Sequence, residues 1–340
     1  VRNTTMHMTL RPGEALVWEN GRVRAQRYWH LAFPERRLAP AALGPMVREQ
    51  LVEAVRLRQA GATAGLLLSG GLDAATLLAL MVSAHRPPTR AYTAGLPAAD
   101  EARAAACLAQ HAGVEHVVVS EPLDWAGGMD ALLAAQAGPV GGPEALALAL
   151  AAGPAAAAGA VVIAGVGGEE VFGGGRAVRR AEQVRRYRRL PGLVREGTEV
   201  WARLGRGRFA DALGHLIGSQ RLAPVELYAR TVSRVQPEAR ADLYTPEALA
   251  VLGEAHPWAP LTALFAEAAQ AGAVEVGDVM HYVELVLGLP ARVVAAGAAC
   301  PGLDLRLPLA DHRLAHLLAS APAGERGSAL LGQRVLRTAM

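Results

Sequence analysis

The stretch Ala64–Thr76, AGLLLSGGLDAAT, constrains the fold of this chain more than any other. Its apolar run stops at Ser69-Gly70-Gly71, and a helical pattern then runs from Leu72 to about Met81. This order predicts a buried strand, a tight glycine turn and the start of a helix. Glycines let the backbone approach a ligand closely, and the free N–H groups at a helix start attract anions. The stretch therefore predicts a phosphate-binding turn.

Two side chains of this turn add chemistry. Ser69 offers a hydroxyl donor, and Asp73 lies one turn into the helix, where its carboxylate can hold a magnesium ion that bridges phosphates. The turn is not a Walker loop, because no Gly-Lys-Ser/Thr follows and the chain contains no lysine. A purely structural turn between a strand and a helix is the alternative, since serine and glycine end many strands.

Strand and helix patterns alternate after this turn. The strand-like runs are Arg90–Ala94, Glu115–Val119 and Ala160–Ala164, and the helix-like runs are Ala98–His111, Leu123–Ala135 and Pro143–Ala157. Such alternation predicts an α/β fold with a parallel sheet that helices cover on both faces. Ligands bind these sheets at the carboxyl ends of the strands, where Ser69–Asp73 and the glycine-rich run Gly165–Gly175 both lie.

The regions before and after this α/β part have other sequence patterns. Residues 1–37 form a short N-terminal strand and linker segment, with a hairpin predicted around the turn Asn20-Gly21. An amphipathic helix over Ala42–Ala60 follows. Residues 38–340 are predicted to form one domain, with the α/β part to about residue 175 and a helical part over 176–340.

Composition excludes several classes of protein. With 52% hydrophobic residues in 340, the chain can bury a sizeable core. Cys107 and Cys300 lie far apart and form no CxxC, which argues against a disulfide framework or a cysteine zinc site. The apolar run Glu144–Val162 is broken by glycines and a proline, so we expect no membrane span. Without a signal-peptide pattern, a cytoplasmic location is expected.

The second loop carries the next chemical signal. The run Ala164–Gly175, AGVGGEEVFGGG, combines glycines with two adjacent carboxylates at Glu169 and Glu170. Together with Asp73, these acids can share a magnesium–pyrophosphate group. A glycine-rich turn with solvated acidic side chains is the alternative reading of this loop alone.

Three motifs in order resemble the C-terminal synthetase domain of asparagine synthetase, in the PP-loop ATP pyrophosphatase superfamily. They are Ser69–Asp73, Gly165–Gly175 and Leu305–His312 (LRLPLADH), beside the family patterns SGGLDS, G-E/D-G-x-D-E-L-F-G-G and E-x-R-x-P-F-L-D. Three further segments resemble other parts of the family's sequence more weakly: Arg27-Tyr28-Trp29, Thr93–Glu101 and Ala137–Pro143. The resemblance covers about residues 10 to 340. It implies a five-stranded parallel sheet of the adenine nucleotide α-hydrolase-like kind, followed by a helical C-terminal part.

The resemblance also implies an activity. Family members use ATP and Mg²⁺ to adenylate a carboxylate, aspartate in the type member, and an amine then captures the acyl group with release of AMP and pyrophosphate. We expect a small-molecule carboxylate and ammonia or an amine as substrates. A separate glutaminase and a second copy of the chain are candidate partners, and neither nucleic acid nor a membrane is expected.

Site residues carry over from the family position by position. The resemblance implies that Ser69, Gly70 and Gly71 hold pyrophosphate and that Asp73 and Glu169 bind the metal ion. The nucleoside is expected to contact the backbone at Leu67, Thr93 and Gly165.

The chain departs from the family at several positions. The serine after the motif aspartate is Ala74, an acid of the second motif is Val166, and the glutamate of the third is Asp304. A family lysine that contacts the phosphates aligns with Gln333, so Arg334 is the candidate catalytic cation, although its planar guanidinium is no copy of an ammonium. The chain given also lacks the family's glutaminase domain and the C-terminal extension.

These departures leave two alternatives open. One is a catalytically degraded homologue that acts as a nucleotide-binding or structural partner. The other is a PP-loop tRNA-modifying enzyme, suggested by the arginine-rich run Arg176–Arg189, which reads more simply as a solvated helix. For His281 and Tyr282 we expect helix packing rather than a substrate pocket. The pair His312 and His316 has helical metal-ligand spacing but no evident third ligand.

Overall fold

The structure is a computed structural model. It describes residues 10–61, 63–95, 100–119, 130, 133–134, 143–159, 161–233, 235–252, 258–327 and 333–340. Most of the helix predicted at Leu123–Ala135, the run Ala137–Pro143 up to residue 142, and residues 96–99 of Thr93–Glu101 lie outside these residues.

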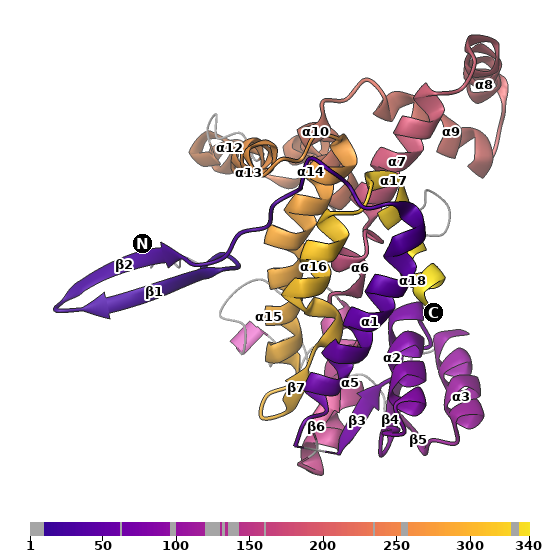
Figure 1. Cartoon of the computed structure of the whole chain (residues 1–340). Helices are drawn as coiled ribbons and strands as arrows, with labels where there is room; N and C mark the ends of the chain where they lie inside the picture. The colour runs from indigo at the N-terminus through magenta and orange to yellow at the C-terminus, as the bar shows by residue number, and fades with distance from the viewer. Residues whose placement is uncertain are drawn as a thin grey trace.

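Five parallel strands form the central sheet, as predicted (Figure 1). They are β3 (Ala64–Leu67), β4 (Ala91–Ala94), β5 (His116–Val119), β6 (Val161–Ile163) and β7 (Asp304–Arg306), in the spatial order β5-β4-β3-β6-β7. The first four lie within a residue or two of their predicted positions. The fifth, β7, comes from the third motif and joins the sheet beside β6.

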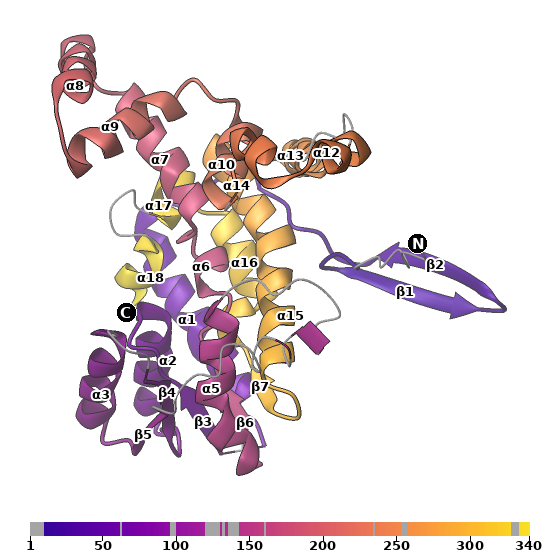
Figure 2. The ribbon, with the colours of Figure 1, turned by 180° about the vertical axis from the view of Figure 1, so that it is seen from behind.

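Alternate residues of the strands point to opposite faces of the sheet. On one face, Leu66 and Ile163 are buried in the main core with α1 (Pro40–Arg58) and α2 (Leu72–Ser83). On the other face, Tyr92 and Val162 pack with α5 (Pro143–Ala157). Figures 1 and 2 show these two layers from opposite sides, with α3 (Asp100–Ala112) beside α2. Both faces are therefore covered, which explains the nearly continuous apolar strands.

The rest of the chain is helical, as predicted. After the short α6 (Gly168–Val171), the helices are α7 (Arg176–Arg188), α8 (Gly192–Leu204), α9 (Arg208–Ser219), α10 (Pro224–Val232), η1 (Pro237–Ala239), α11 (Arg240–Leu243), α12 (Pro246–Leu252), α13 (Ala259–Gln270), α14 (Val276–Val283), η2 (Glu284–Gly288), α15 (Leu289–Ala299), η3 (Pro308–Ala310), α16 (His312–Ala319), α17 (Ala323–Arg326) and α18 (Arg334–Ala339).

A continuous helical segment runs through α14, η2 and α15, and its middle section η2 is a π-helical turn. By length and composition alone this segment is apolar enough to cross a membrane, a test that the core helix of a globular domain also passes. Here its residues Met280, Tyr282 and Leu285 belong to the main core. Asp278 is buried between the guanidinium groups of Arg37 and Arg326. Its last part, α15, packs against α5 and is followed by β7, so the segment connects the helical part to the sheet.

A separate hairpin precedes the domain. Strands β1 (Glu14–Glu19) and β2 (Arg22–Arg27) pair in antiparallel fashion around Asn20 and Gly21, which both have positive φ. This is the backbone that a two-residue Asn-Gly turn requires, so the predicted hairpin is confirmed. In Figures 1 and 2 the hairpin extends away from the helices and the sheet.

Candidate active site at the carboxyl edge of the sheet

The two glycine-containing loops meet where the strand order reverses. From β3 the chain passes to β4 and β5 on one side, and β6 lies next to β3 on the other side. The loops that follow β3 and β6 therefore leave the sheet side by side at its carboxyl edge. This switch point is where ligands bind in open parallel sheets.

The first loop has the conformation of an anion-binding turn. Gly70 has a φ of +77°, and a Cβ at this position would lie 2.4 Å from the backbone oxygen of Glu101, so only glycine fits. The Gly71 N–H donates to the Ser69 hydroxyl over 3.3 Å, and Gly71 is the N-cap of the 12-residue helix α2. The first N–H groups of α2 thus face the open end of this loop.

Asp73 lies directly against the second loop. A Cβ at Gly168 would lie 2.4 Å from the Asp73 carboxyl group, and one at Gly165 would lie 2.9 Å from the Asp73 Cβ. Glycine at both positions is therefore what lets the second loop close over this carboxylate. The structure thereby brings together three of the predicted site residues, namely Ser69, Asp73 and Gly165.

The electrostatics of Asp73 are unusual for a carboxylate. Burial raises its pKa from 3.8 to about 7; the negative charges of Glu169 and Glu170 act in the same direction, and the hydrogen bond from Gln333 opposes them. That hydrogen bond runs from Gln333 Nε2 to Asp73 Oδ1 over 2.6 Å. A carboxylate that is this buried and has acidic neighbours is suited to a divalent cation.

An arginine from α15 lies among these acids. Arg292 Nε pairs with Glu170 over 2.9 Å, and its Nη2 pairs with Glu169 over 3.3 Å. Glu284, in the π-helical turn, is also buried; burial and the neighbouring charge of Glu170 raise its pKa to about 7. The site therefore contains four carboxylates, contributed by Asp73, Glu169, Glu170 and Glu284.

The candidate catalytic cation, Arg334, points elsewhere. Its guanidinium pairs with Glu325 over 3.3 Å, and half of its side chain is exposed. The residue before it, Gln333, is 9% exposed and reaches Asp73 from a left-handed backbone with a φ of +37°. At this position the structure thus presents a neutral amide to the site, and the guanidinium near the carboxylates comes from Arg292.

A protein-family model matches most of this chain. The model of the family described as asparagine synthase matches residues 46–340. The chain belongs to the asparagine synthase family. Membership supports an ATP-dependent amide-ligase type of function, and the matched range includes both loops and α15. A comparison with curated proteins gives no match.

The structure shows the surroundings of two positions at which the chain departs from the asparagine synthase motifs. Ala74 is buried on α2 in the main core, where the family's serine would be. Val166 packs with the cluster around Leu67 and Tyr92, so the second loop contributes an apolar contact at the position of a family acid. The carboxylates of the site follow Val166 in sequence, at Glu169 and Glu170.

The positions expected to contact a nucleoside also lie at this edge. Leu67 is the last residue of β3, Thr93 lies near the end of β4, and Gly165 follows β6. The Thr93 hydroxyl donates to the backbone oxygen of Leu68 and lies 2.8 Å from His116 Nε2. Its side chain therefore ties three neighbouring strands together at this edge.

The third asparagine synthase motif is structural in this chain. Arg306 pairs with Asp304 over 2.8 Å and donates to the backbone oxygen of Arg58 over 2.7 Å. Asp311 accepts the N–H of Arg313 as the N-cap of α16 and pairs with Arg58 over 2.6 Å. The motif thus fastens β7 and α16 to the end of α1.

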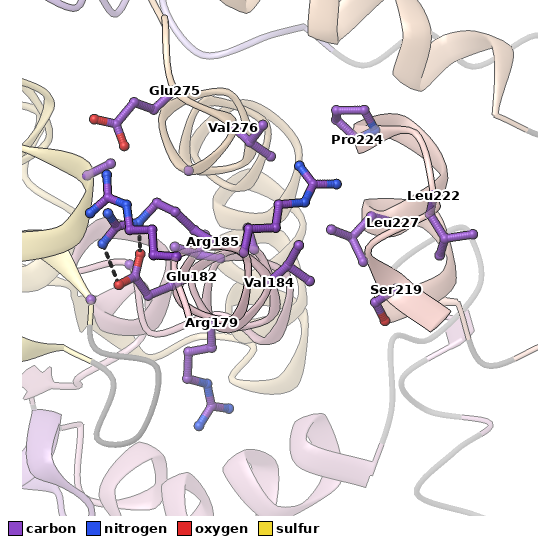
Figure 3. Close-up of a pocket in the computed structure, with 18 of the residues that line it drawn as sticks. Arg179, Glu182, Val184, Arg185, Ser219, Leu222, Pro224, Leu227, Glu275 and Val276 are labelled. Atoms are coloured by element: carbon purple, nitrogen blue, oxygen red, sulfur yellow. Dashed lines mark hydrogen bonds and ion pairs between the residues drawn. The ribbon is translucent and has the colours of Figure 1, made fainter. Parts of the chain in front are cut away.

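A cavity of about 430 Å³ lies beside α7 (Figure 3). Among the described residues, its lining includes Arg179, Arg185 and Glu182 but not Asp73 or Glu169. Figure 3 shows Arg185 and Glu182 joined by hydrogen bonds and Arg179 pointing away from Pro224. Arg188 and Arg189 of the run line the cavity as well. The other face of α7 buries Ala177, Val178 and Val184 in the main core, so the helix predicted to be solvated is solvated on one side only.

Two of the three histidines singled out in the sequence, His281 and His316, have packing roles. His281 is fully buried, its Nε2 lies 2.9 Å from the Val171 backbone oxygen, and burial lowers its pKa to about 3. His316 Nε2 accepts a hydrogen bond from Trp29 Nε1 over 2.7 Å, whereas His312 is exposed. Within the described part of the chain, no group of three or more metal-ligating side chains includes either His312 or His316.

Sequence reasoning missed Arg292 and Glu284 as site residues. Both belong to the apolar stretch Val276–Ala299, which is distant in sequence from the two glycine loops. Their charge could have identified them in the sequence, because an ionised side chain inside an apolar core helix needs a partner.

Proposed function

We propose that the protein is an ATP-dependent amide ligase that adenylates an aspartate-like carboxylate and transfers the acyl group to ammonia or an amine. The observation that carries this proposal is the contact between Asp73 and the second loop at the switch point, for which Gly165 and Gly168 leave room. The proposed phosphate turn and the proposed magnesium ligand thus lie together in a chain of the asparagine synthase family.

In this proposal an oxygen of the substrate carboxylate attacks the α-phosphorus of ATP, and the bond to pyrophosphate breaks. The amine nitrogen then attacks the acyl carbon, the bond to the AMP oxygen breaks, and one proton is released from nitrogen. The Gly71 N–H and the Ser69 hydroxyl are assigned to the leaving pyrophosphate, and the strand-end backbone at Leu67, Thr93 and Gly165 to the nucleoside. Positioning is the main contribution of these groups.

The residues present fit a magnesium ion that arrives with ATP. Asp73 and Glu169 offer oxygen ligands, and the raised pKa of Asp73 reflects its burial and the neighbouring charges of Glu169 and Glu170, which Arg292 neutralises only in part. Within the described residues, no three His, Cys, Asp or Glu side chains are arranged to chelate a metal alone. Magnesium sites that borrow phosphate oxygens use one or two carboxylates, as here. The ion would neutralise the charge of the phosphates.

A specific observation favours a second candidate function. Gln333 donates to Asp73 where the family has a lysine, and Arg334 is turned toward Glu325. A homologue that binds nucleotide without turnover would have this arrangement. In that case the chain acts as a partner of another synthetase or of a separate glutaminase, which in the first candidate would supply ammonia.

One experiment separates the two candidates. ATP binding is measured by calorimetry, and AMP is measured from labelled ATP with Mg²⁺, aspartate-like carboxylates and ammonia, beside Asp73→Ala. AMP formation that requires Asp73 supports the ligase, and Gln333→Lys should then raise the rate. Binding of ATP with no AMP from any carboxylate would support the second candidate. Absence of ATP binding would contradict the ligase and support a purely structural partner role.

A further inference from the structure

Helix α8 is amphipathic with its apolar side turned outward. Its inner side faces the protein, where the Tyr187 hydroxyl lies 2.8 Å from the Thr198 hydroxyl and 3.3 Å from the Arg195 backbone oxygen. Trp201, at the flank, meets the ring of Phe209 at 4.9 Å. In Figures 1 and 2, α8 lies at the outer end of the helical part, beside α9 and far from the sheet.

The outward side carries a stripe of four residues that we call the α8 stripe: Leu193, Gly197, Val200 and Leu204. Leu193 is 84% exposed, Val200 54% and Leu204 79%. Their spacing of four, three and four residues is that of a two-stranded coiled-coil seam. Large apolar side chains this exposed on one helix face indicate a surface that another molecule covers.

Two opposite charges border the same edge of the stripe. Glu196 and Arg203 are both exposed and lie seven residues apart, about 10 Å along a helix, which is too far for them to pair with each other. Within the described residues, neither takes part in an ion pair. A helix that covers the stripe is complementary to it when it offers a positive charge near Glu196 and a negative charge near Arg203.

We propose that α8 pairs with α8 of a second copy of this chain, in antiparallel orientation about a two-fold axis near Gly197 and Val200. In that pairing Glu196 of each copy meets the partner's Arg203, and both charged contacts form by symmetry. Leu193 of each copy covers the partner's Leu204. Gly197, which has no atom within 4 Å of the position its Cβ would take, lets the two backbones come close.

The area of the proposed interface determines how tightly the two copies are expected to bind. Two helices of 13 residues bury less area than a standard stable interface. The dimer should therefore be reversible, with a dissociation constant of about 10–100 μM. This proposal does not depend on the ligase activity.

Sedimentation velocity between low and high micromolar concentration tests it with four proteins: the wild type, Glu196→Arg, Arg203→Glu and the double reversal. Each single reversal creates two like-charged contacts per dimer and should weaken association about tenfold, whereas the double reversal should restore it. Val274→Glu, at a site 87% exposed outside α8, should leave association unchanged. Circular dichroism melts would check that every variant is folded.

The proposal is overturned if the wild type stays monomeric over this range, or if both single reversals dimerise as the wild type does. Failure of the double reversal to recover association, with the fold intact, would also reject it. Binding of a monomeric chain to phosphatidylserine vesicles, lost in Leu193→Glu, would instead assign the stripe to a membrane surface.

Discussion

At the scale of single residues, the account depends on a buried carboxylate. Burial and the negative charges of Glu169 and Glu170 disfavour the ionised form of Asp73 in the folded protein, and the hydrogen bond from Gln333 offsets only part of this effect. Arg292 neutralises part of this charge through its pairs with Glu169 and Glu170. Carboxyl groups whose pKa is shifted by burial and by neighbouring charges are typical of functional sites.

The pKa of Asp73 gives a stability prediction with a definite sign. Because the folded-state pKa is about 7 and the ordinary value 3.8, the folded state loses stability as pH rises from about 4 through 7. Asp73→Asn removes this loss. In the absence of Mg²⁺, the variant should melt above the wild type at pH 8 and close to it at pH 4, with the exposed Asp211→Asn as the control. An equal difference at both pH values would contradict the assignment.

The two arginines offer a matched comparison. We assign stabilisation of the charge on the phosphates to Arg292, because its guanidinium lies among the carboxylates of the site. Arg292→Ala should therefore lower AMP formation by about 100–1000-fold. Arg334→Ala should change the rate less than about threefold if its pair with Glu325 persists. A larger loss of AMP formation in Arg334→Ala would show that Arg334 is the catalytic cation, as its place in the motif predicts.

At the scale of elements, the third motif holds the sheet edge to α1. Burial alone would raise the pKa of Asp311, but hydrogen bonds from Arg313 and Arg58 outweigh this and hold it well below the usual range. The stabilisation is thus present above about pH 4 and is lost as pH falls further. Asp311 thus links α16 to α1 through one carboxylate.

Asp311→Asn keeps an N-cap side chain while removing the charge. It should lower the free energy of unfolding by about 2–4 kcal/mol at pH 7, since it leaves Arg58 without its buried partner. The difference from the wild type should shrink as pH falls below 4. Urea titration at several pH values measures this, and a loss below about 0.5 kcal/mol at pH 7 would show that the pair is not stabilising.

Elements with a strong local pattern could be predicted, and those defined by distant contacts could not. Strands β3 to β6 are apolar runs between glycine or polar turns, and the helix at Pro143–Ala157 has its predicted bounds. Strand β7 has the sequence Asp-Leu-Arg, which lacks the apolar run that marks β6, and it exists because it pairs with β6. The π-helical turn at Glu284 likewise has no local signal.

At the scale of the whole molecule, the strand order decides where the site lies. Ser69–Asp73 and Glu169 could be placed at one edge from sequence, because parallel strands put their carboxyl ends together. The contacts of Gln333 and Arg292 depend on how the helical part folds back onto the sheet, which periodicity does not encode. The glutamine at position 333 was visible in the sequence, but its hydrogen bond to Asp73 was not.

The central claim is that a carboxylate becomes joined to AMP in this site. Aspartate labelled with oxygen-18 in its side-chain carboxylate tests it directly, with ATP, Mg²⁺ and ammonia, and with mass analysis of the AMP formed. The account predicts one labelled oxygen in AMP from the wild type and no AMP from Asp73→Ala. AMP without the label would contradict transfer through the carboxylate, and absence of AMP from the wild type would contradict the ligase assignment for this substrate.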